Sequence, residues 1–170
     1  MKLGALILAE VIREQIKEDR VGIMLPATAG ANVVMMATLL ANKVPVMINW
    51  TLGDANLEHV LEVSGIDTIL TSGRFLDRLE TLNYRLIQDL VLTLEDVAHQ
   101  RLTLGRKLAA LWRSLRGPKA LLRHYGSDRA TADDPCIILF TSGSEAAPKG
   151  VPLTHRNVIA NCLQIQQCHL

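Results

Sequence analysis

The sequence has few of the features that mark secreted, membrane-spanning or nucleic-acid-binding proteins. Its three cysteines are an odd number with no CxxC pair, so we expect no disulfides and a reducing compartment. The longest uncharged apolar run, residues 33–41, is far too short to cross a bilayer. The net charge is +1, from 18 basic and 17 acidic residues, which indicates no general attraction to nucleic acid. These absences favour a cytoplasmic protein.

Aromatic residues are also scarce, at 4% of the chain, whereas 49% of its 170 residues are hydrophobic. A chain of this length buries enough surface for one domain with a core, and that core must be aliphatic. Cys162, Cys168 and His169 do not fall at a familiar zinc spacing, so the sequence predicts no metal site.

Apolar β-type segments alternate with helical segments along most of the chain. The helical pattern predicts helices over residues 3–18, 30–42, 54–63 and 75–82. Short apolar runs predict strands over residues 20–25, 44–49, 67–71, 89–93 and 136–140. Alternation with short turns is typical of an α/β fold in which a parallel sheet is covered by helices on both faces. Ligands of such sheets bind at the carboxyl ends of the strands.

The alternation is interrupted between residues 97 and 127 by a basic, amphipathic segment. This segment holds seven Lys or Arg residues and no acidic residue, which leaves the rest of the chain with 11 basic and 17 acidic residues, a net charge of −6. On a helix its leucines share one face, two arginines lie opposite, and a tryptophan flanks the apolar stripe. We expect Pro118 to end this helix.

Three interpretations of the 97–127 insert remain open. It lies on an anionic membrane surface, it docks on an acidic partner such as a carrier protein, or it is a connector that packs its leucines on the sheet and exposes its basic face. On the membrane interpretation, apolar side chains enter the headgroup region and arginines lie near anionic lipid. The residues predicted to make these contacts are Leu104, Leu108, Leu111, Trp112 and Leu115, with Arg106, Arg113 and Arg116.

The stretch FTSGSEAAPKG, residues 140–150, runs from a buried strand directly into hydroxyl residues, glycines and one lysine. Backbone N–H groups in such a turn form a concavity that binds anions, and a nearby lysine adds a mobile positive charge. The stretch is not a Walker A loop, which would require Gly at position 148 and Ser or Thr at position 150, where the chain has Pro148 and Gly150. The sequence therefore predicts a loop that holds a polyphosphate by another pattern.

The longer stretch ILFTSGSEAAPKGVPLTHRN closely resembles the phosphate-binding signature of the AMP-forming adenylating enzymes, which include acyl-CoA and acyl–acyl carrier protein synthetases. The matching residues are Thr141, Ser142, Gly143, Ser144, Glu145, Pro148, Lys149 and Gly150. His155 falls where the family has a histidine before a helix. With Glu145, the loop is most similar to the synthetase half of bifunctional 2-acylglycerophosphoethanolamine acyltransferases. Upstream, residues 21–72 are similar to the family's opening α/β repeats, so the resemblance covers most of the chain.

The resemblance implies ATP with Mg²⁺ as cofactors and a fatty acid as substrate. In the family the fatty acid carboxylate attacks the α-phosphate of ATP, giving an acyl-adenylate and pyrophosphate, and the acyl group then passes to the phosphopantetheine thiol of an acyl carrier protein or CoA. Lys149 is the implied catalytic residue, which holds the β- and γ-phosphates with the loop N–H groups. Thr141, Ser142 and Ser144 would donate hydroxyl hydrogen bonds, and Gly143 and Gly150 would let the backbone approach.

Two departures from the family pattern shape the remaining expectations. Ala146 stands where the family has glycine, and alanine resists the positive φ that glycine permits. The family's later motifs, for adenine, ribose and a closing lid, do not occur in these residues. We therefore expect residues 1–170 to be part of an AMP-binding domain, the N-terminal portion of the adenylate-forming fold, inactive in isolation. Two further partners stay open. One is a membrane surface, with the protein attached peripherally to an inner membrane, and the other is a second copy of the chain.

Overall fold

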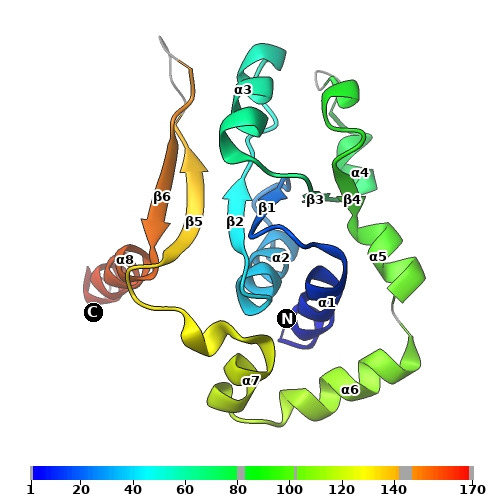
Figure 1. Ribbon diagram of the computed structural model, residues 1–170, viewed down its shortest axis with the longest axis vertical. Helices are drawn as coiled ribbons and strands as arrows, with labels where there is room; N and C mark the ends of the chain where they lie inside the picture. The colour runs from blue at the N-terminus through cyan, green and yellow to red at the C-terminus, as the bar shows by residue number, and fades with distance from the viewer. Residues whose placement is uncertain (1, 80–82, 102, 142–146, 169–170) are drawn as a thin grey trace.

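Within residues 2–79, 83–101, 103–141 and 147–168, which the computed structural model describes, six strands form one sheet (Figure 1). The strands are β1 (Arg20–Ile23), β2 (Val44–Met47), β3 (Ile69–Thr71), β4 (Val91–Thr93), β5 (Pro135–Phe140) and β6 (Gly150–Thr154). Their order across the sheet is β4-β3-β1-β2-β5-β6. Neighbours are parallel except β5 and β6, which form an antiparallel hairpin. The predicted α/β fold is confirmed, with an antiparallel strand at one edge.

Helices cover both faces of this sheet, as predicted. They are α1 (Lys2–Gln15), α2 (Ala29–Leu40), α3 (Asp54–Ser64), α4 (Gly73–Leu76), α5 (Leu94–Arg101), α6 (Leu104–Ser114), α7 (Pro118–Tyr125) and α8 (His155–Cys168), with 3₁₀ turns η1 (Tyr84–Leu86) and η2 (Ser127–Arg129). The helix predicted over residues 75–82 is shorter than expected, because α4 ends at Leu76, and residues 80–82 lie outside the described part of the chain. No helix of the described residues combines the length and apolar character needed to cross a membrane.

The two faces of the sheet belong to separate apolar clusters, one with α1 and α2 and the other with α3. In β1, Val21 and Ile23 are fully buried in the first cluster, whereas Gly22 between them faces Ile48 and Ile66 of the second. Successive side chains of a strand point to opposite faces, so a strand between two helix layers is apolar on both sides. This double burial is why the central strands appear in the sequence as apolar runs.

Helix α1 supplies much of the first cluster. Its residues Leu6, Val11 and Ile12 are at most 1% exposed. Each fully buried side chain of this size contributes about 1.5–3 kcal/mol relative to an exposed one. The helix therefore binds firmly to α2 and the sheet, and it forms a fixed base for the segment that follows β4.

That segment, predicted as one amphipathic helix ending at Pro118, is divided between α5, α6 and α7. Helix α6 ends at Ser114, and Pro118 is the first residue of α7 rather than a terminator of α6. Proline is tolerated at the first helical position because its missing N–H would have no partner within the helix there. The prediction that Pro118 ends the helix is therefore wrong in detail, since the chain turns before it.

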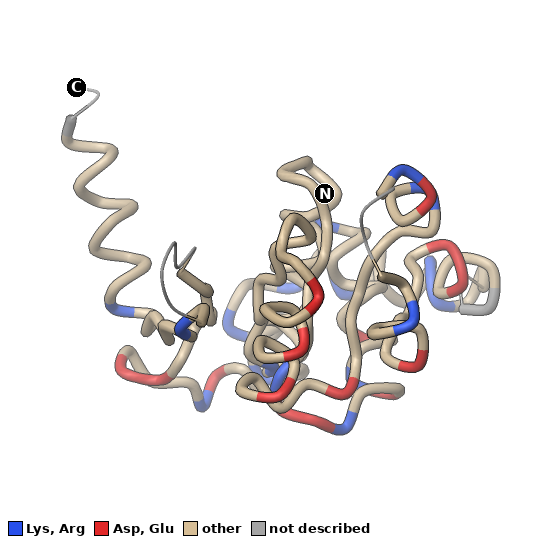
Figure 2. Tube along the Cα trace, turned by 90° about the horizontal axis from the view of Figure 1, so that it is seen from above, with Lys and Arg blue, Asp and Glu red and all other residues tan. Residues whose placement is uncertain are grey.

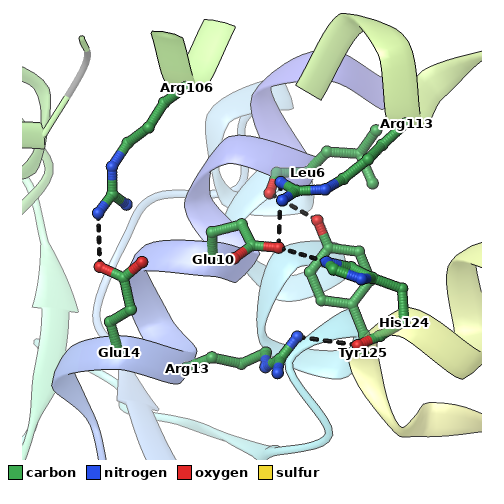
Figure 3. Close-up of polar contacts among 8 residues, drawn as sticks. All are labelled: Leu6, Glu10, Arg13, Glu14, Arg106, Arg113, His124 and Tyr125. Atoms are coloured by element: carbon green, nitrogen blue, oxygen red, sulfur yellow. Dashed lines mark hydrogen bonds and ion pairs between the residues drawn. The ribbon is translucent and has the colours of Figure 1, made fainter. Parts of the chain in front are cut away.

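The orientation of α6 differs from the connector prediction, because its arginines face α1 (Figure 3). Arg106 Nη2 lies 2.6 Å from Glu14 Oε2 of α1, and Arg113 Nη1 lies 3.2 Å from Glu10 Oε1. The leucines of α6 point away from α1, and Leu104 is 74% exposed. The connector interpretation, with leucines packed on the sheet, is wrong. Arg106 and Arg113 are paired with carboxylates on α1, and their contact with lipid stays a prediction.

Helix α7 is tied to α1 by a polar cluster around Glu10 (Figure 3). His124 Nε2 lies 2.8 Å from Glu10 Oε1, and Arg13 Nη1 donates to the His124 backbone oxygen at 2.9 Å. The Tyr125 hydroxyl donates to the Leu6 backbone oxygen at 3.0 Å. Burial raises the pKa of Tyr125 to about 12, and the negative charge of Glu10 adds to the effect.

The raised pKa of Tyr125 predicts a loss of stability at alkaline pH. The folded state disfavours the phenolate, so the stabilisation is fully present below the ordinary pKa of 10.0 and is lost as pH rises toward about 12. We expect Tyr125→Phe to lower the free energy of unfolding by about 1 kcal/mol at pH 8, through loss of the buried hydrogen bond. Urea unfolding of both proteins should show this difference shrinking between pH 10 and 12. A difference that stays constant over that window would contradict the prediction.

Candidate functional site

The predicted phosphate loop joins β5 to β6 at the carboxyl end of β5, at the upper end of the hairpin in Figure 1. The hairpin pairs Phe140 with Gly150 beside the loop and Pro135 with Thr154 at its other end. The structure describes Thr141 and residues 147–150 of this segment. The predicted site residues Ser142, Gly143, Ser144 and Glu145, together with Ala146, lie outside the described residues.

Two hydrogen bonds close the base of the loop. The Thr141 N–H donates to the Lys149 backbone oxygen at 3.1 Å, and the Lys149 N–H donates to Thr141 Oγ1 at 3.2 Å. Thr141 Oγ1 accepts this bond, and within the described residues its hydroxyl donates no hydrogen bond. Pro148 is buried and Lys149 is exposed at the mouth of the loop. In the described part of the chain no ion pair involves Lys149, so its charge is open to an anion.

Gly150 has a packing role that the sequence does not show. A Cβ atom at this position would lie 3.2 Å from Phe140 Cζ and 3.3 Å from Phe140 Cε1, its cross-strand neighbour. These distances are tighter than ordinary van der Waals contact, so the absence of a side chain lets the Phe140 ring cover the strand. Gly150 thus leaves room for the Phe140 ring directly beneath the loop.

The structure does not bring His155 together with the loop. His155 begins α8 after β6, and its N–H donates to the Asp134 backbone oxygen at 3.1 Å, beside the start of β5. The five residues of β6, which span about 17 Å at about 3.4 Å per residue, therefore separate His155 from Lys149. His155 instead lines a cavity of about 520 Å³ at the amino ends of β2 and β5, with Lys43, Arg129 and Asp134.

Sequence reasoning missed two arginines at the same edge of the sheet as the loop. A cleft of about 340 Å³ lies at the carboxyl ends of β1 and β3, where α2 begins, and Arg74 and Arg78 line it. Thr28 Oγ1 caps α2 by accepting the Ala31 N–H at 3.4 Å. The signal was present in the sequence, because both arginines follow β3 closely. Since β2 lies between β1 and β5, the ends of β1 and β3 lie about 10 Å and about 14 Å from β5 across the sheet.

Glu95, at the start of α5, holds the turn between β3 and α4 in place at this edge of the sheet. It accepts hydrogen bonds from the Ser72 hydroxyl at 2.7 Å and from the Gly73 N–H at 3.0 Å. Burial opposes ionisation of Glu95, but these hydrogen bonds outweigh it and lower the pKa of the carboxyl. Glu95 therefore stays ionised and holds the β3–α4 turn, which carries Arg74, against α5.

A metal centre is not indicated by the described residues, which contain no group of three or more His, Cys, Asp or Glu side chains placed to hold one. What the carboxyl edge presents is cationic: Lys149 at the hairpin loop, and Arg74 and Arg78 at the neighbouring cleft. Backbone N–H groups and exposed cations at the carboxyl ends of parallel strands favour a phosphorylated ligand.

Comparison with known proteins agrees with this architecture. The chain is 27% identical over 167 residues to the long-chain-fatty-acid–CoA ligase of Salmonella typhimurium, a match that covers 88% of this chain and 30% of the ligase. It is 29% identical over 154 residues to fatty acyl-CoA synthetase A of Dictyostelium discoideum, covering 85% and 22%. The chain thus spans less than a third of these relatives.

Solved structures share the fold. The fatty acyl-adenylate ligase from L. pneumophila, in complex with acyl adenylate and pyrophosphate, superposes with a TM-score of 0.67 at 18% identity, covering 96% of this chain and 26% of that one. Mycobacterium smegmatis MbtA superposes with a TM-score of 0.56 at 28% identity, covering 94% and 28%. The profile of one family, described as AMP-binding enzyme, matches residues 4–170. With the sheet, the hairpin loop and this match in agreement, the chain belongs to the AMP-binding enzyme family.

Proposed function

We propose that this chain supplies the phosphate-binding part of a site that activates a fatty acid to an acyl-adenylate. The observation that carries the proposal is the hairpin loop, closed at its base by Thr141 and Lys149, with the lysine exposed and free of ion pairs in the described residues. The likeness to fatty-acid–CoA ligases supports a fatty acid as the acid that is activated.

Catalysis of this reaction would depend mostly on neutralising the negative charge of the ATP phosphates. A carboxylate oxygen of the fatty acid forms a bond to the α-phosphorus of ATP, the bond from that phosphorus to the bridging oxygen breaks, and pyrophosphate leaves with the electron pair. Lys149 would hold the β- and γ-phosphates, whose charge grows as the bond breaks. Thr141 would donate its hydroxyl proton, and the segment 142–146 would supply further N–H and hydroxyl donors.

Mg²⁺ would enter this site on the phosphates of ATP. The carboxylates that the structure describes do not gather at the loop, and magnesium in nucleotide sites is bound largely by phosphate oxygens and water. The ion would supply additional neutralisation of phosphate charge. The contribution assigned to this chain is therefore the lysine and the loop donors.

The acceptor in the second half of the reaction would be a phosphopantetheine thiol. Its thiolate would attack the acyl carbonyl, a C–S bond would form, and AMP would leave. The names of the curated relatives favour CoA as the carrier of this thiol. Glu145, through its resemblance to acyl–acyl carrier protein synthetases, favours a carrier protein.

Competition among phosphate ligands tests the proposed function directly. We expect the 170-residue chain to bind ATP and pyrophosphate at one site, because the loop contacts the β- and γ-phosphates that both share. AMP, which lacks these phosphates, should compete at least about tenfold more weakly. Equilibrium dialysis with radiolabelled ATP and each competitor at low salt measures this order. Equal competition by AMP and pyrophosphate would contradict the assignment of the loop.

Ala146 gives a second test of the loop, although it lies outside the described residues. At a position whose backbone φ is positive, alanine destabilises the folded state by on the order of 1 kcal/mol relative to glycine. We therefore expect Ala146→Gly to tighten ATP binding about fivefold or to raise the thermal midpoint by a few degrees. Calorimetry with and without ATP measures both. No change in either quantity would mean that the loop accommodates alanine without strain.

A further inference from the structure

Helix α6 carries an apolar ridge that points away from the rest of the molecule. The ridge consists of Leu104, Leu108, Leu111, Trp112 and Leu115, which are between 52% and 79% exposed. Soluble proteins rarely expose this much contiguous apolar surface without a partner. In Figure 1, α6 runs along the lower edge of the molecule, and α1 lies on its inner side.

The outward orientation of the ridge is held by contacts on the opposite side of α6. Ala110 is 1% exposed against the body, and the ion pairs Arg106–Glu14 and Arg113–Glu10 join α6 to α1 (Figure 3). Residues of a helix are about 100° apart, so Arg106 and Arg113 are roughly opposite the leucines. Turning the leucines inward would break both ion pairs and leave Glu10 and Glu14 without these partners.

Basic side chains flank the ridge on both sides. Lys107 is exposed next to the leucines on one side, and on the other the Arg116 guanidinium carbon lies 3.9 Å from the centre of the Trp112 ring. Such stacking keeps the arginine charge beside the apolar surface. Residues 97–127 contain no acidic side chain, so nothing in the segment offsets these charges. An apolar ridge with a tryptophan and a basic border complements an anionic lipid surface.

We propose that the α6 ridge inserts into the headgroup region of an anionic membrane and anchors this protein there peripherally. The proposal goes beyond adenylation and is independent of the phosphate loop. A second copy of the chain fits the ridge less well, because an isologous dimer would bring the basic borders of two α6 helices together. The ridge is also only about 16 Å long, whereas a stable dimer buries about 800 Å² on each partner.

Vesicle binding tests the proposal. The 170-residue chain should sediment with vesicles of phosphatidylcholine mixed with phosphatidylglycerol at low salt, and much less with phosphatidylcholine alone. Binding to the mixed vesicles should weaken as salt is added, because salt screens the basic border. Trp112 fluorescence should shift to the blue on binding, and Trp112→Phe should abolish the shift while the half-buried Trp50 remains.

Helix α8 offers a matched control, because its apolar residues are as exposed as those of α6, and its one arginine, Arg156, is paired with Asp133. Figure 2 shows α8, which leads to the C-terminus, with basic colour only near its start. Leu108 and Leu111 are 58% and 52% exposed, and Ile159 and Leu163 of α8 are 57% and 54% exposed. Replacing the α6 pair by glutamine should reduce vesicle affinity at least about tenfold. The same change to the α8 pair should leave it unchanged.

Charge and self-association complete the test. Lys107→Gln should lower affinity for mixed vesicles about fivefold and leave the weak binding to neutral vesicles unaltered. Circular dichroism melts should verify that all variants fold as the parent does. Equal binding to both vesicle types, or equal losses from the α6 and α8 pairs, would overturn the proposal. A lipid-free dimer in sedimentation velocity that the α6 pair abolishes would assign the ridge to a second copy instead.

Discussion

Replacing Lys149 with alanine is expected to weaken binding of ATP and of pyrophosphate to this chain by about 10- to 100-fold. A hydrogen bond to a charged group contributes about 1.5–3 kcal/mol, and Lys149 is the cation at the mouth of the hairpin loop. The side chain is exposed and makes no ion pair within the described residues, so its removal should not disturb the fold. Equilibrium dialysis of both ligands measures the effect.

Lys119→Ala is the matched control for this experiment. Lys119 is also exposed, and it lies on α7, far along the chain from the hairpin. Its removal changes the net charge by the same amount, so a general loss of attraction to polyphosphate would appear in both variants. Lys149→Arg should keep part of the affinity, since it keeps the positive charge but replaces the compact ammonium group with a planar guanidinium. Unaltered affinity in Lys149→Ala would contradict the assignment of the loop as the phosphate site.

Replacing Gly22 with valine is expected to destabilise the fold by about 3 kcal/mol. A Cβ atom on Gly22 would lie 2.7 Å from Ile66 Cδ1 and 2.8 Å from Ile48 Cδ1, inside the packed layer between β1 and α3. Valine adds two further methyl groups, so the isoleucines must shift or leave their preferred rotamers. Urea unfolding followed by circular dichroism should show a lower midpoint with an unchanged slope.

Two further variants separate overpacking from the general effect of adding a side chain. Gly117 precedes α7 with φ −65° and ψ 158° and has open space where a Cβ would lie, so Gly117→Val should cost less than about 1 kcal/mol. Ile66→Val removes the atom that a Cβ at position 22 would meet first, so adding it to Gly22→Val should restore part of the lost stability. Equal losses from Gly22→Val and Gly117→Val would rule out overpacking as the cause.

The orientation of α6 has consequences beyond its surface. Glu10 of α1 lies within hydrogen-bonding or ion-pairing distance of both Arg113 and His124, so one carboxylate helps to position α6 and α7 together (Figure 3). The surface of α1 that carries Glu10 and Glu14 is thereby covered by a basic segment. The excess of acidic residues outside residues 97–127 is thus partly neutralised within the fold, and the same contacts leave the leucines of α6 unpartnered.

Much of the architecture was readable from the residues because the interactions that determine it are local. The apolar strands around Val21, Val46 and Leu70 alternate with amphipathic helices. A strand buried on both faces is a continuous apolar run, which can be identified from the local sequence alone. The position of the loop was also readable, since hydroxyl residues, glycines and a lysine directly after a strand favour a turn, and its role as a phosphate site stays a prediction. The family followed from that same stretch, and the match over residues 4–170 confirmed it.

Contacts between distant residues decided the rest, and no local pattern encodes them. The antiparallel pairing of β6 placed His155 beside the start of β5, away from the loop that it follows closely in the sequence. The amphipathic pattern of α6 fits either orientation of the helix equally well. The observed orientation pairs Arg106 and Arg113 with Glu14 and Glu10, which lie more than ninety residues earlier in the chain. Because these ion pairs exist only in the folded chain, the tertiary structure alone turned the leucine face toward solvent.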